Sequence, residues 1–504
     1  MNKQGIVYLI GAGPGDIGLL TLRAKEVLEK AEVVVYDRLA DPQLLAFAPA
    51  AEKIYVGKAS SHHSMPQAEI NKLLVKLAAE GKTVARLKGG DPLVFGRGGE
   101  EALELKKHKL PFVFVPGITS AIAVPEYAGI PVTHRQLATS FAVITGHEDP
   151  AKGTSSLKWA GLATAVDTLV FLMGVENIVT ITKNLLAYGR AADTPAAFIR
   201  WGTKAEQETL VTTLGQAAQL AQTTQLKPPA IFLVGSVVTL RQDLNWFEKL
   251  PLFGKTIVVT RARTQASKLT RQLANLGAKV WEIPTIKILP LDDFTLLDKA
   301  ISQLASYHWI IFTSVNGVES FFQRLKAKGL DSRSFAHAKL AAIGTATAAA
   351  LLHEGLRADV IPATYKAEDL LAALKPYIQT GKKILLARAQ KAREVLPQGL
   401  EALGAQVDTL AVYKTCPDCT SAPELSAALR QGSLDCITFT SSSTVNKLVN
   451  ILGPDAALLN KTTLAAIGPI TAATCQKHNL EVKITAQEYT IEGLVQALTA
   501  YYKE

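Results

Sequence analysis

Short apolar runs alternate along almost the whole chain with longer segments whose apolar residues recur at helical spacing. The first run covers residues 7–10 and leads into a glycine-rich turn. Such alternation is typical of α/β domains. The pattern breaks at residues 245–259, where aromatic residues, a proline and a glycine precede a new apolar run. Because a single hydrophobic core seldom grows much beyond about 250 residues, we predict the main domain boundary at this break.

The second half of the chain repeats itself. A segment that begins GKTIVVTRA at Gly254 recurs as GKKILLARA at Gly381, 127 residues later, and Ser314 and Ser441 are the same distance apart. The repeat predicts two similar α/β lobes that face a ligand across a cleft. In each lobe a strand leads into small hydroxyl residues that open a helix, and such helix N-termini bind carboxylates or phosphates. Any one of these hydroxyls can also simply cap its helix.

The first glycine-rich turn, GAGPGD at residues 11–16, is similar to the phosphate-binding turn of a dinucleotide-binding domain. Asp37 follows about twenty residues later, where a nicotinamide enzyme holds a ribose. The fingerprint nevertheless requires a third glycine where this chain has Asp16, and Pro14 lacks the backbone donor that a pyrophosphate would use. A nicotinamide oxidoreductase fused to a two-lobed non-enzymatic binding module is therefore the alternative interpretation, not the preferred one.

The composition narrows the possible partners. A net charge of +10 favours an acidic partner, but no run of basic residues indicates nucleic acid, so a polyanionic small molecule fits equally well. No apolar stretch predicts a signal peptide or a membrane helix, and four cysteines in 504 residues do not form a disulfide framework. We therefore expect a cytoplasmic protein that binds neither nucleic acid nor membranes.

A second glycine-rich stretch, RLKGGDPLVFGRGGEE at residues 86–101, carries the most specific signal. Paired glycines let the backbone approach a ligand closely, and Asp91 offers an acceptor for an amine or hydroxyl. The turn lacks the Gly-Lys-Thr/Ser of a phosphate loop, which favours a nucleoside without phosphates. Further motifs follow as VPGITSA at 115–121, AGIPVTHR at 128–135 and LVFLMG at 169–174.

Together these motifs resemble the S-adenosylmethionine-dependent uroporphyrinogen-III C-methyltransferases, from residue 7 to about 238. The resemblance implies two lobes, about 1–130 and 131–245, with the cofactor between them. It implies that Asp37 is a catalytic base or proton relay on the substrate side. The implied cofactor-binding residues are Pro14, Gly89, Gly90, Asp91, Val94, Thr119, Ser120, Ala121, Met173, Pro229 and Ala230. For the substrate's carboxylates the candidates are Arg38, Lys58, His134 and Arg135, with Arg86 and Arg97 as further cations; which of His62 and His63 matters stays open.

The second half resembles uroporphyrinogen-III synthase, the enzyme that makes the methyltransferase's substrate. The resemblance implies a cofactor-free reaction that expels the hydroxyl of hydroxymethylbilane and closes the ring with one pyrrole inverted. It implies a synthase over residues 255–504 after a linker at 246–254. One lobe would take 255–287 plus 416–504, and the other 288–412. Tyr413, at the end of a predicted strand, matches a tyrosine proposed to help the hydroxyl leave, although a half-buried strand tyrosine explains it equally well. Ser314, Thr347, Ser441 and Thr471 are the candidate ligand contacts.

We therefore predict a two-lobed tetrapyrrole methyltransferase module followed by a two-lobed synthase module with internally repeated α/β lobes. The bifunctional enzyme would make uroporphyrinogen III and methylate it twice with S-adenosylmethionine to precorrin-2. We expect no metal site, because Cys416 and Cys419 have no second ligand pair near them in the sequence. The resemblance implies a homodimer through the methyltransferase module. The sequence does not distinguish cobalamin from sirohaem as the end product.

Overall fold

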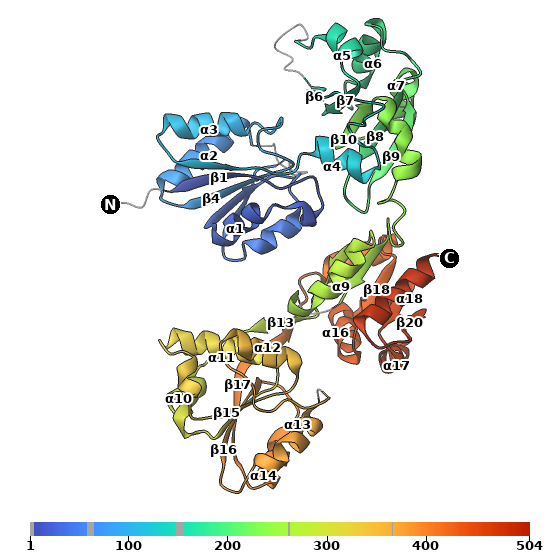
Figure 1. The fold of residues 1–504 in the computed structure, drawn as a ribbon. Coiled ribbons are helices and arrows are strands. Elements are labelled where there is room, and N and C mark those ends of the chain that lie inside the picture. The colour runs from blue at the N-terminus through green and yellow to red at the C-terminus, as the bar shows by residue number, and fades with distance from the viewer. Residues whose placement is uncertain (1–4, 58–64, 148–155, 261–262, 365, 504) are drawn as a thin grey trace. The chain divides into compact units, whose positions relative to one another are not determined.

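The computed structural model describes residues 5–57, 65–147, 156–260, 263–364 and 366–503. The chain divides into two compact units. Figure 1 labels most of its helices and strands. One unit comprises residues 1–257, 270–281 and 498–504, and the other comprises 258–269 and 282–497. Each unit contains α/β sheets, which confirms the predicted fold class. None of the helices in the described part of the chain is both long and apolar enough to cross a bilayer.

The first sheet is entirely parallel, in the order β3-β2-β4-β1-β5. Its strands are nearly continuous apolar runs because helices cover both faces: one buried cluster lies on the side of α1, and another includes α2 and α3. The carboxyl ends of parallel strands share one edge of a sheet, where ligands of such folds bind. The elements are β1 (Ile6–Gly11), α1 (Leu22–Lys30), β2 (Val33–Tyr36), β3 (Glu52–Tyr55), α2 (Gln67–Ala79), β4 (Thr83–Lys88), α3 (Gly98–Lys107) and β5 (Phe112–Val115).

The second sheet is mixed, in the order β6-β7-β10-β8-β9. Only β6 and β7 pair in parallel; β10 runs antiparallel to β7 and β8, and β9 antiparallel to β8. Helix α4, which follows β5, buries Ala121 and Val124 against apolar residues of this sheet. The elements are α4 (Ser120–Tyr127), β6 (Phe141–Thr145), α5 (Trp159–Ala165), β7 (Thr168–Leu172), α6 (Ile178–Ala187), β8 (Pro195–Arg200), β9 (Glu208–Thr213), α7 (Leu214–Thr223), β10 (Ala230–Val234) and α8 (Arg241–Leu244).

The remaining residues form two more sheets, in the orders β12-β11-β18-β19-β20 and β13-β17-β16-β14-β15. Their strands are β11 (Thr256–Val259), β12 (Lys279–Glu282), β13 (Ile286–Leu289), β14 (Trp309–Phe312), β15 (Lys339–Ala342), β16 (Lys383–Ala389), β17 (Gln406–Pro417), β18 (Cys436–Phe439), β19 (Thr463–Ala466) and β20 (Ile484–Thr485). Their helices are α9 (Arg263–Asn275), α10 (Thr295–Ser302), α11 (Val315–Ala327), α12 (Thr345–His353), α13 (Ala367–Leu374), α14 (Val395–Ala402), α15 (Ala422–Gln431), α16 (Ser442–Leu452), α17 (Pro469–Lys477) and α18 (Ile491–Lys503).

The sequence repeat corresponds to repeated structural elements. Strand β14 and helix α11 recur as β18 and α16 at the same 127-residue offset, and α12 recurs as α17 after 124 residues. The repeat is not the boundary between the sheets, because β11 and β12 join β18 while β16 and β17 join β14. The predicted domain limits remain a prediction. The proposed lobe limits at 287/288 and 412/416 fall inside β13 and β17.

The segment 246–254, predicted as a linker, contributes buried side chains. Phe247 is 6% exposed and Leu252 is fully buried. The Phe247 ring packs edge-on against Tyr127 and Phe253. An apolar segment that buries its side chains in this way is held by packing, unlike the polar, flexible linkers that usually join domains.

Candidate functional sites

Two glycine turns meet at the carboxyl ends of β1 and β4. Gly13 and Gly90 exchange two backbone hydrogen bonds, with N···O distances of 3.2 and 2.8 Å, and the Ala12 amide donates to the Lys88 carbonyl. A Cβ on Gly11 would lie 2.4 to 2.6 Å from backbone atoms of Gly117 and Gly90. Glycine is therefore required here by close approach of three backbone segments, which explains why the turn is rich in glycine without being a dinucleotide site.

The Asp91 side chain fixes the second glycine turn. Its Oδ1 accepts hydrogen bonds from the amides of Leu93 and Val94, and its Oδ2 accepts one from Gly117. A carboxylate has about four lone-pair sites, so most of the accepting capacity of Asp91 is used by backbone. The sequence suggested Asp91 as an acceptor for a ligand amine or hydroxyl. In the structure its carboxylate mainly holds the loops around Gly90 in place through these backbone hydrogen bonds.

The turn before α4 lies beside Gly90. Thr119 caps this helix by accepting a hydrogen bond from the Ala121 amide at 3.3 Å. A Cβ placed on Gly90, whose φ is +67°, would lie 3.7 Å from the Ser120 nitrogen and 3.8 Å from the Thr119 Cα. Gly90 thus leaves open a space that any larger residue would fill. Val94 packs against the apolar cluster that contains Ala121.

Other predicted cofactor residues lie on the second lobe. Met173 directly follows β7, is 52% exposed and has φ of +56°, which is uncommon for a residue with a side chain. Outliers of this kind cluster at functional sites. Next to it, Gly146 and Gly174 approach so closely that a Cβ on Gly146 would lie 2.3 Å from the Gly174 Cα. Pro229 and Ala230 stand at the start of β10.

Asp37, which follows β2, is held by a buried cation. Its Oδ2 lies 3.3 Å from Arg86 Nη2, and its Oδ1 accepts a hydrogen bond from the Leu39 amide. The Asp37 side chain is 26% exposed, whereas that of Arg86 is 3% exposed. Arg86 was suggested as a partner of the substrate; its burial makes it instead a partner of Asp37.

Behind Asp37 lies a network of buried charges that the sequence analysis did not identify. Glu101, fully buried on α3, accepts from Arg86 Nε at 3.2 Å and from Lys88 Nζ at 2.8 Å. Gln67 Nε2 donates to the same oxygen, Oε1, while Oε2 has no hydrogen-bond partner among the described residues. Burial and the charge of Arg86 lower the pKa of Lys88, and Glu101 opposes that shift. The available signal was the pair of cations at alternate positions of an otherwise apolar strand, which places both on one face.

The predicted substrate contacts are distributed around the lobes. Arg38 is exposed next to Asp37, and a Cβ on Gly57 would lie 3.0 Å from the Arg38 nitrogen. His134 accepts a hydrogen bond from the Gln136 amide through Nδ1, and Arg135 is exposed. Arg97 forms a surface ion pair with Glu100 at 2.7 Å. Lys58, His62 and His63 lie outside the described residues.

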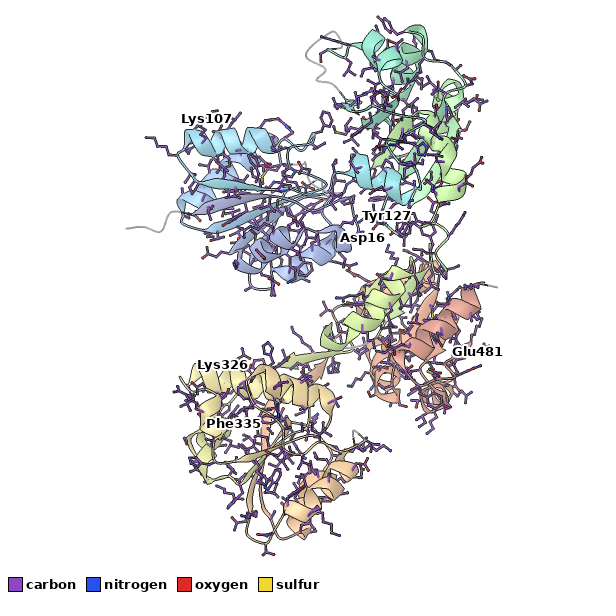
Figure 2. The ribbon with its side chains drawn as sticks, viewed as in Figure 1. Asp16, Lys107, Tyr127, Lys326, Phe335 and Glu481 are labelled. Atoms are coloured by element: carbon purple, nitrogen blue, oxygen red, sulfur yellow. The ribbon has the colours of Figure 1, made fainter. Side chains whose placement is uncertain are left out.

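Asp16, which stands where the dinucleotide fingerprint needs glycine, connects distant parts of its unit. Its Oδ2 accepts a hydrogen bond from Tyr127 Oη at 2.8 Å, and its amide donates to Thr203 Oγ1 at 3.0 Å; Asp16 and Tyr127 are labelled in Figure 2. Lys204 Nζ forms an ion pair with Asp41 at 2.9 Å. These contacts explain why an acidic side chain replaces the third glycine: it joins the first sheet to elements of the second lobe.

In the other unit, Tyr413 lies inside β17 and not at its end. The strand continues to Pro417, and the side chain is 7% exposed. The pairing with β16 is irregular at this point, because Arg388 pairs with Ala411 while the next residue, Ala389, pairs with Tyr413. The Tyr413 Oη lies 3.0 Å from Ser314 Oγ. The structure therefore brings together two of the predicted synthase residues.

The other three predicted synthase residues lie in the first turns or at the N-cap of repeated helices. Thr347 in α12 and Thr471 in α17 are 4% and 5% exposed. Ser441 caps α16, as Ser314 caps α11. Of the four predicted contact residues, all within the described part of the chain, the structure pairs Ser314 with Tyr413.

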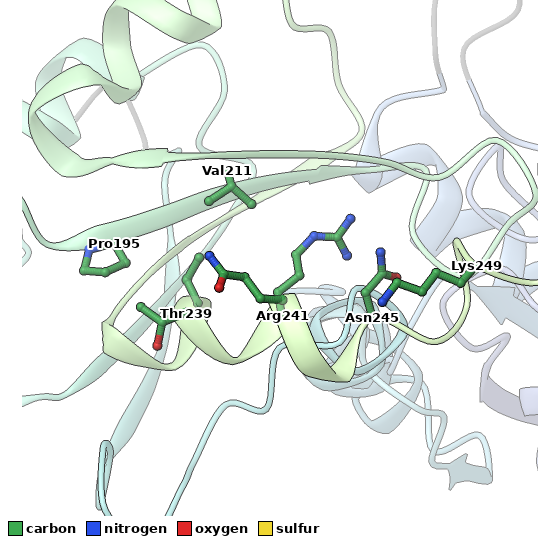
Figure 3. A pocket seen from close by; sticks show the side chains of 8 residues that line it. Pro195, Val211, Thr239, Arg241, Asn245 and Lys249 are labelled. Carbon is green, nitrogen blue, oxygen red and sulfur yellow. The ribbon is translucent and has the colours of Figure 1, made fainter.

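Cys416 and Cys419 are unpaired, as are the chain's two other cysteines. Within the described residues, no group of three or more His, Cys, Asp or Glu side chains is arranged to hold a metal ion. A cavity of about 360 Å³ lies between β9 and α8 (Figure 3), lined by residues that include Val211, Arg241 and Asn245. None of the predicted site residues lines it, so it is separate from the candidate sites.

Comparisons with known proteins divide the chain into the two segments that the motifs predict. Residues 6–218 match the tetrapyrrole (corrin/porphyrin) methylases, and residues 267–496 match uroporphyrinogen-III synthase HemD. The chain is 38% identical to the porphyrin biosynthesis protein HemD of Ruminiclostridium josui over 98% of both chains. It is 54% identical to an S-adenosyl-L-methionine-dependent uroporphyrinogen III methyltransferase of Methanosarcina barkeri, over 48% of this chain and 96% of that protein. Among solved structures, a uroporphyrin-III C-methyl transferase of Thermus thermophilus with S-adenosyl homocysteine shares 43% identity, covers 46% of this chain and 99% of its own, and has a TM-score of 0.41.

The resemblance inferred from the motifs is thus confirmed for both halves. The relative from Ruminiclostridium josui aligns with both halves in one chain, so the two segments occur together in more than one protein. The chain belongs to the porphyrin-biosynthesis family of that HemD protein, with a tetrapyrrole methylase segment followed by a uroporphyrinogen-III synthase segment.

Proposed function

We propose that the chain catalyses two consecutive reactions of tetrapyrrole synthesis. The C-terminal segment closes hydroxymethylbilane to uroporphyrinogen III with inversion of one ring. The N-terminal segment then methylates that product twice, with S-adenosylmethionine as methyl donor, to give precorrin-2. The observation that carries the proposal is the presence of both family segments in one chain. The name of the relative from Methanosarcina barkeri, 54% identical over 245 residues, supports the choice of methyl donor.

The methyl donor would be held around the open space beside Gly90. S-Adenosylmethionine supplies an electrophilic methyl group when bound, so the protein has mainly to position two reactants. The fit is supported by the space that a Gly90 Cβ would fill and by the turn of Thr119 and Ser120 next to it. The other residues assigned to this site are Pro14, Gly89, Asp91, Val94, Ala121, Met173, Pro229 and Ala230.

Asp37 would accept the proton that the substrate ring loses after methylation. Its partial exposure and its ion pair with Arg86 favour a carboxylate that reaches a ligand while its orientation is fixed. The substrate carries eight carboxylates, for which cationic side chains are natural partners. Arg38, His134, Arg135 and Lys58 are the proposed contacts.

Tyr413 would stabilise the leaving hydroxyl in the synthase reaction. As the C–O bond breaks, the electron pair moves to oxygen, and a phenol O–H can donate a hydrogen bond to that developing charge. The proton released when the new carbon–carbon bond closes the ring completes the water molecule that leaves. Thr347, Thr471 and Ser441 are the proposed contacts for the substrate around this point, whereas Ser314 contacts Tyr413.

An anaerobic assay tests both reactions. Purified protein receives hydroxymethylbilane with and without S-adenosylmethionine, and the products are resolved as type I or type III macrocycles and as methylated forms. We expect type III product without the methyl donor and dimethylated product with it. Type I product alone, from spontaneous closure, would contradict the synthase assignment. Type III product that is never methylated would contradict the proposed methylation.

We propose further that the enzyme is cytoplasmic and forms a homodimer through the methylase segment. All four cysteines are unpaired, as is usual in a reducing compartment. The homodimer rests on the resemblance alone. Mass photometry of the full chain and of a variant truncated after the methylase segment distinguishes a monomer from a dimer.

A further inference from the structure

The hydroxyl of Ser314 is shared between a helix and Tyr413. Ser314 is the N-cap of α11, and its Oγ accepts a hydrogen bond from the Gly317 amide at 3.0 Å. The same Oγ lies 3.0 Å from Tyr413 Oη, and either hydroxyl can be the donor in that pair. The contact joins the start of a helix to the middle of β17, 99 residues apart in the chain.

The backbone of β17 is irregular where Tyr413 enters this contact. The pairing shifts between Arg388 and Ala389, so that Val412 is left without an opposite residue on β16. Irregularities of this kind re-aim the following side chain and are frequent next to active sites. The strand therefore has a local feature that turns Tyr413 toward the N-terminus of α11.

The pair can arrange its protons in two ways, which differ in where the phenol proton points. A serine hydroxyl has one proton and two lone pairs, and the Gly317 amide occupies one lone pair. If Ser314 donates its proton to the phenol oxygen, the phenol proton is free to point at a ligand. Tyr307, in the same lobe, is different: its hydroxyl donates to the Asp408 carboxylate at 2.6 Å, and an ionised carboxylate can only accept.

We propose that Ser314 is a positioning residue for the leaving-group step, and that it acts through Tyr413. Its hydroxyl donates to the Tyr413 oxygen and leaves the phenol proton directed at the departing hydroxyl. The inference rests on the proposed role of Tyr413. A phenol oxygen that accepts a hydrogen bond is a better donor, because bonds in a chain polarise one another, and the chain starts at a helix N-terminal amide whose dipole favours the same polarisation. The bonds broken and formed remain those of the hydroxyl loss and ring closure described above.

The repeat supplies a comparison within the molecule. Ser441 occupies the equivalent position, with φ and ψ of −169° and 157° against −167° and 157° for Ser314. It also caps its helix, by accepting from the Thr444 amide at 3.4 Å, but its other hydroxyl neighbour is Ser443 and not a tyrosine. Capping is therefore common to both serines, and the contact with a phenol belongs to Ser314.

The test is a set of variants of the full chain, assayed anaerobically with hydroxymethylbilane for kcat, KM and the ratio of type III to type I product. Ser314→Ala is expected to lower kcat about tenfold or more, since it disturbs one preorganised donor, with KM nearly unchanged. Ser314→Thr keeps both the cap and the donor and is expected to restore kcat. Ser314→Asp keeps the cap but can only accept, so it binds the phenol proton and is expected to be as slow as Ser314→Ala.

Two control variants separate the possible explanations. Tyr413→Phe tests the proposed function itself: if it leaves kcat unchanged, that role and this inference both fail. If Tyr413→Phe is slow but Ser314→Ala and Ser314→Asp are fast, only the inference fails. Ser332→Ala, which removes another partly buried hydroxyl bonded to a backbone carbonyl, is expected to keep its kcat.

A change confined to KM in Ser314→Ala would assign this hydroxyl to substrate binding and would overturn the inference. A Ser314→Asp variant as fast as Ser314→Thr, with Ser314→Ala slow, would assign the effect to helix capping and would also overturn it. Methylation of supplied uroporphyrinogen III by the same preparations shows that each variant is folded in its other half. Because Ser314→Thr and Ser314→Asp both preserve the cap, their difference remains informative if Ser314→Ala does not fold.

Discussion

The two segments hold their candidate groups by opposite physical means. In the methylase segment Asp37 is fixed by Arg86, which is itself held with Lys88 by the buried Glu101. In the synthase segment Tyr413 is fixed by a neutral hydroxyl that also caps a helix. Buried charges cost much to desolvate, and removing one partner leaves the others uncompensated. Neutral hydrogen bonds cost less to break. The comparison therefore predicts a large loss of stability when a buried charge of the first segment is removed. It predicts a smaller effect, mainly on the reaction rate, when the hydroxyl pair of the second segment is broken.

The largest effect is expected for Glu101→Gln, which leaves Lys88 buried without its counter-ion and leaves Arg86 with Asp37 alone. We expect the free energy of unfolding of this region, measured by hydrogen exchange, to fall by about 3–5 kcal/mol, the usual cost of breaking a buried ion pair. Hydrogen exchange of the β4 peptide, followed by mass spectrometry, measures it. Glu104→Gln on the same helix is the control, because its partner Lys107 is 71% exposed and such pairs contribute little. Equal protection from hydrogen exchange in the two variants would contradict a stabilising role of the buried Glu101 ion pairs.

Asp37→Asn is expected to lower the rate of methylation by about 10²- to 10³-fold, which is typical for loss of a general base. The measurement is kcat for methylation of supplied uroporphyrinogen III under anaerobic conditions. The synthase reaction of the same chain is the internal control. An unchanged methylation rate would show that the ion pair with Arg86 is purely structural.

Tyr307→Phe sharpens the comparison within the synthase segment. The Tyr307 hydroxyl donates a hydrogen bond to the Asp408 carboxylate. Burial and, to a smaller extent, that carboxylate raise the pKa of Tyr307. We expect a loss of stability of about 1–3 kcal/mol, the range for a hydrogen bond to a charged group, with kcat and product type unchanged. Tyr413→Phe is expected to show the reverse pattern, slow but stable. Urea denaturation followed by pulse proteolysis, beside the cyclisation assay, distinguishes the two.

The smallest effect concerns pH. Because the pKa of Lys88 is lowered from its ordinary 10.5, the unfolded chain binds more protons than the folded chain between the lowered pKa and 10.5. The contribution of Lys88 to stability therefore rises with pH through that window, and its cost is fully present below it. We expect wild type to gain stability relative to Lys88→Met between neutral pH and pH of about 10. A constant difference, measured by pulse proteolysis in urea, would contradict the burial of a charged Lys88.

The motifs identified the family and the fold because local backbone geometry restricts which residues can stand at their positions. Gly11 and Gly90 must be glycine where backbones touch or φ is positive, so the turns are visible in the sequence. The repeat at Ser314 and Ser441 follows from helix caps at equivalent places, and it predicted the repeated elements. Apolar runs covered on both faces identified the strands, because burial selects the residue types directly.

The site was less predictable, since it depends on partners distant in the chain. Arg86 and Lys88 stand at alternate positions of an apolar strand, which places both on one face, but nothing local identified Asp37 as the partner of Arg86. Glu101 lies in a run of charged residues that is equally typical of a solvated helix face. Asp91 has the right chemistry for a ligand, but its carboxylate accepts hydrogen bonds from Leu93 and Val94 in its own turn and from Gly117 in a separate loop. Tyr413 was predicted at a strand end, whereas β17 extends further.

By itself the sequence determined the alternation of strands and helices, the glycine turns, the repeat and the two families, since each depends on residue types at short range or at fixed spacing. The tertiary structure alone decided which side chains meet. It paired Arg86 with both Asp37 and Glu101, Asp16 with Tyr127, and Ser314 with Tyr413. Such pairings form between segments brought together by sheet order and helix packing. The charge or hydroxyl group of a side chain limits what it can bind, but the fold determines which groups lie next to it.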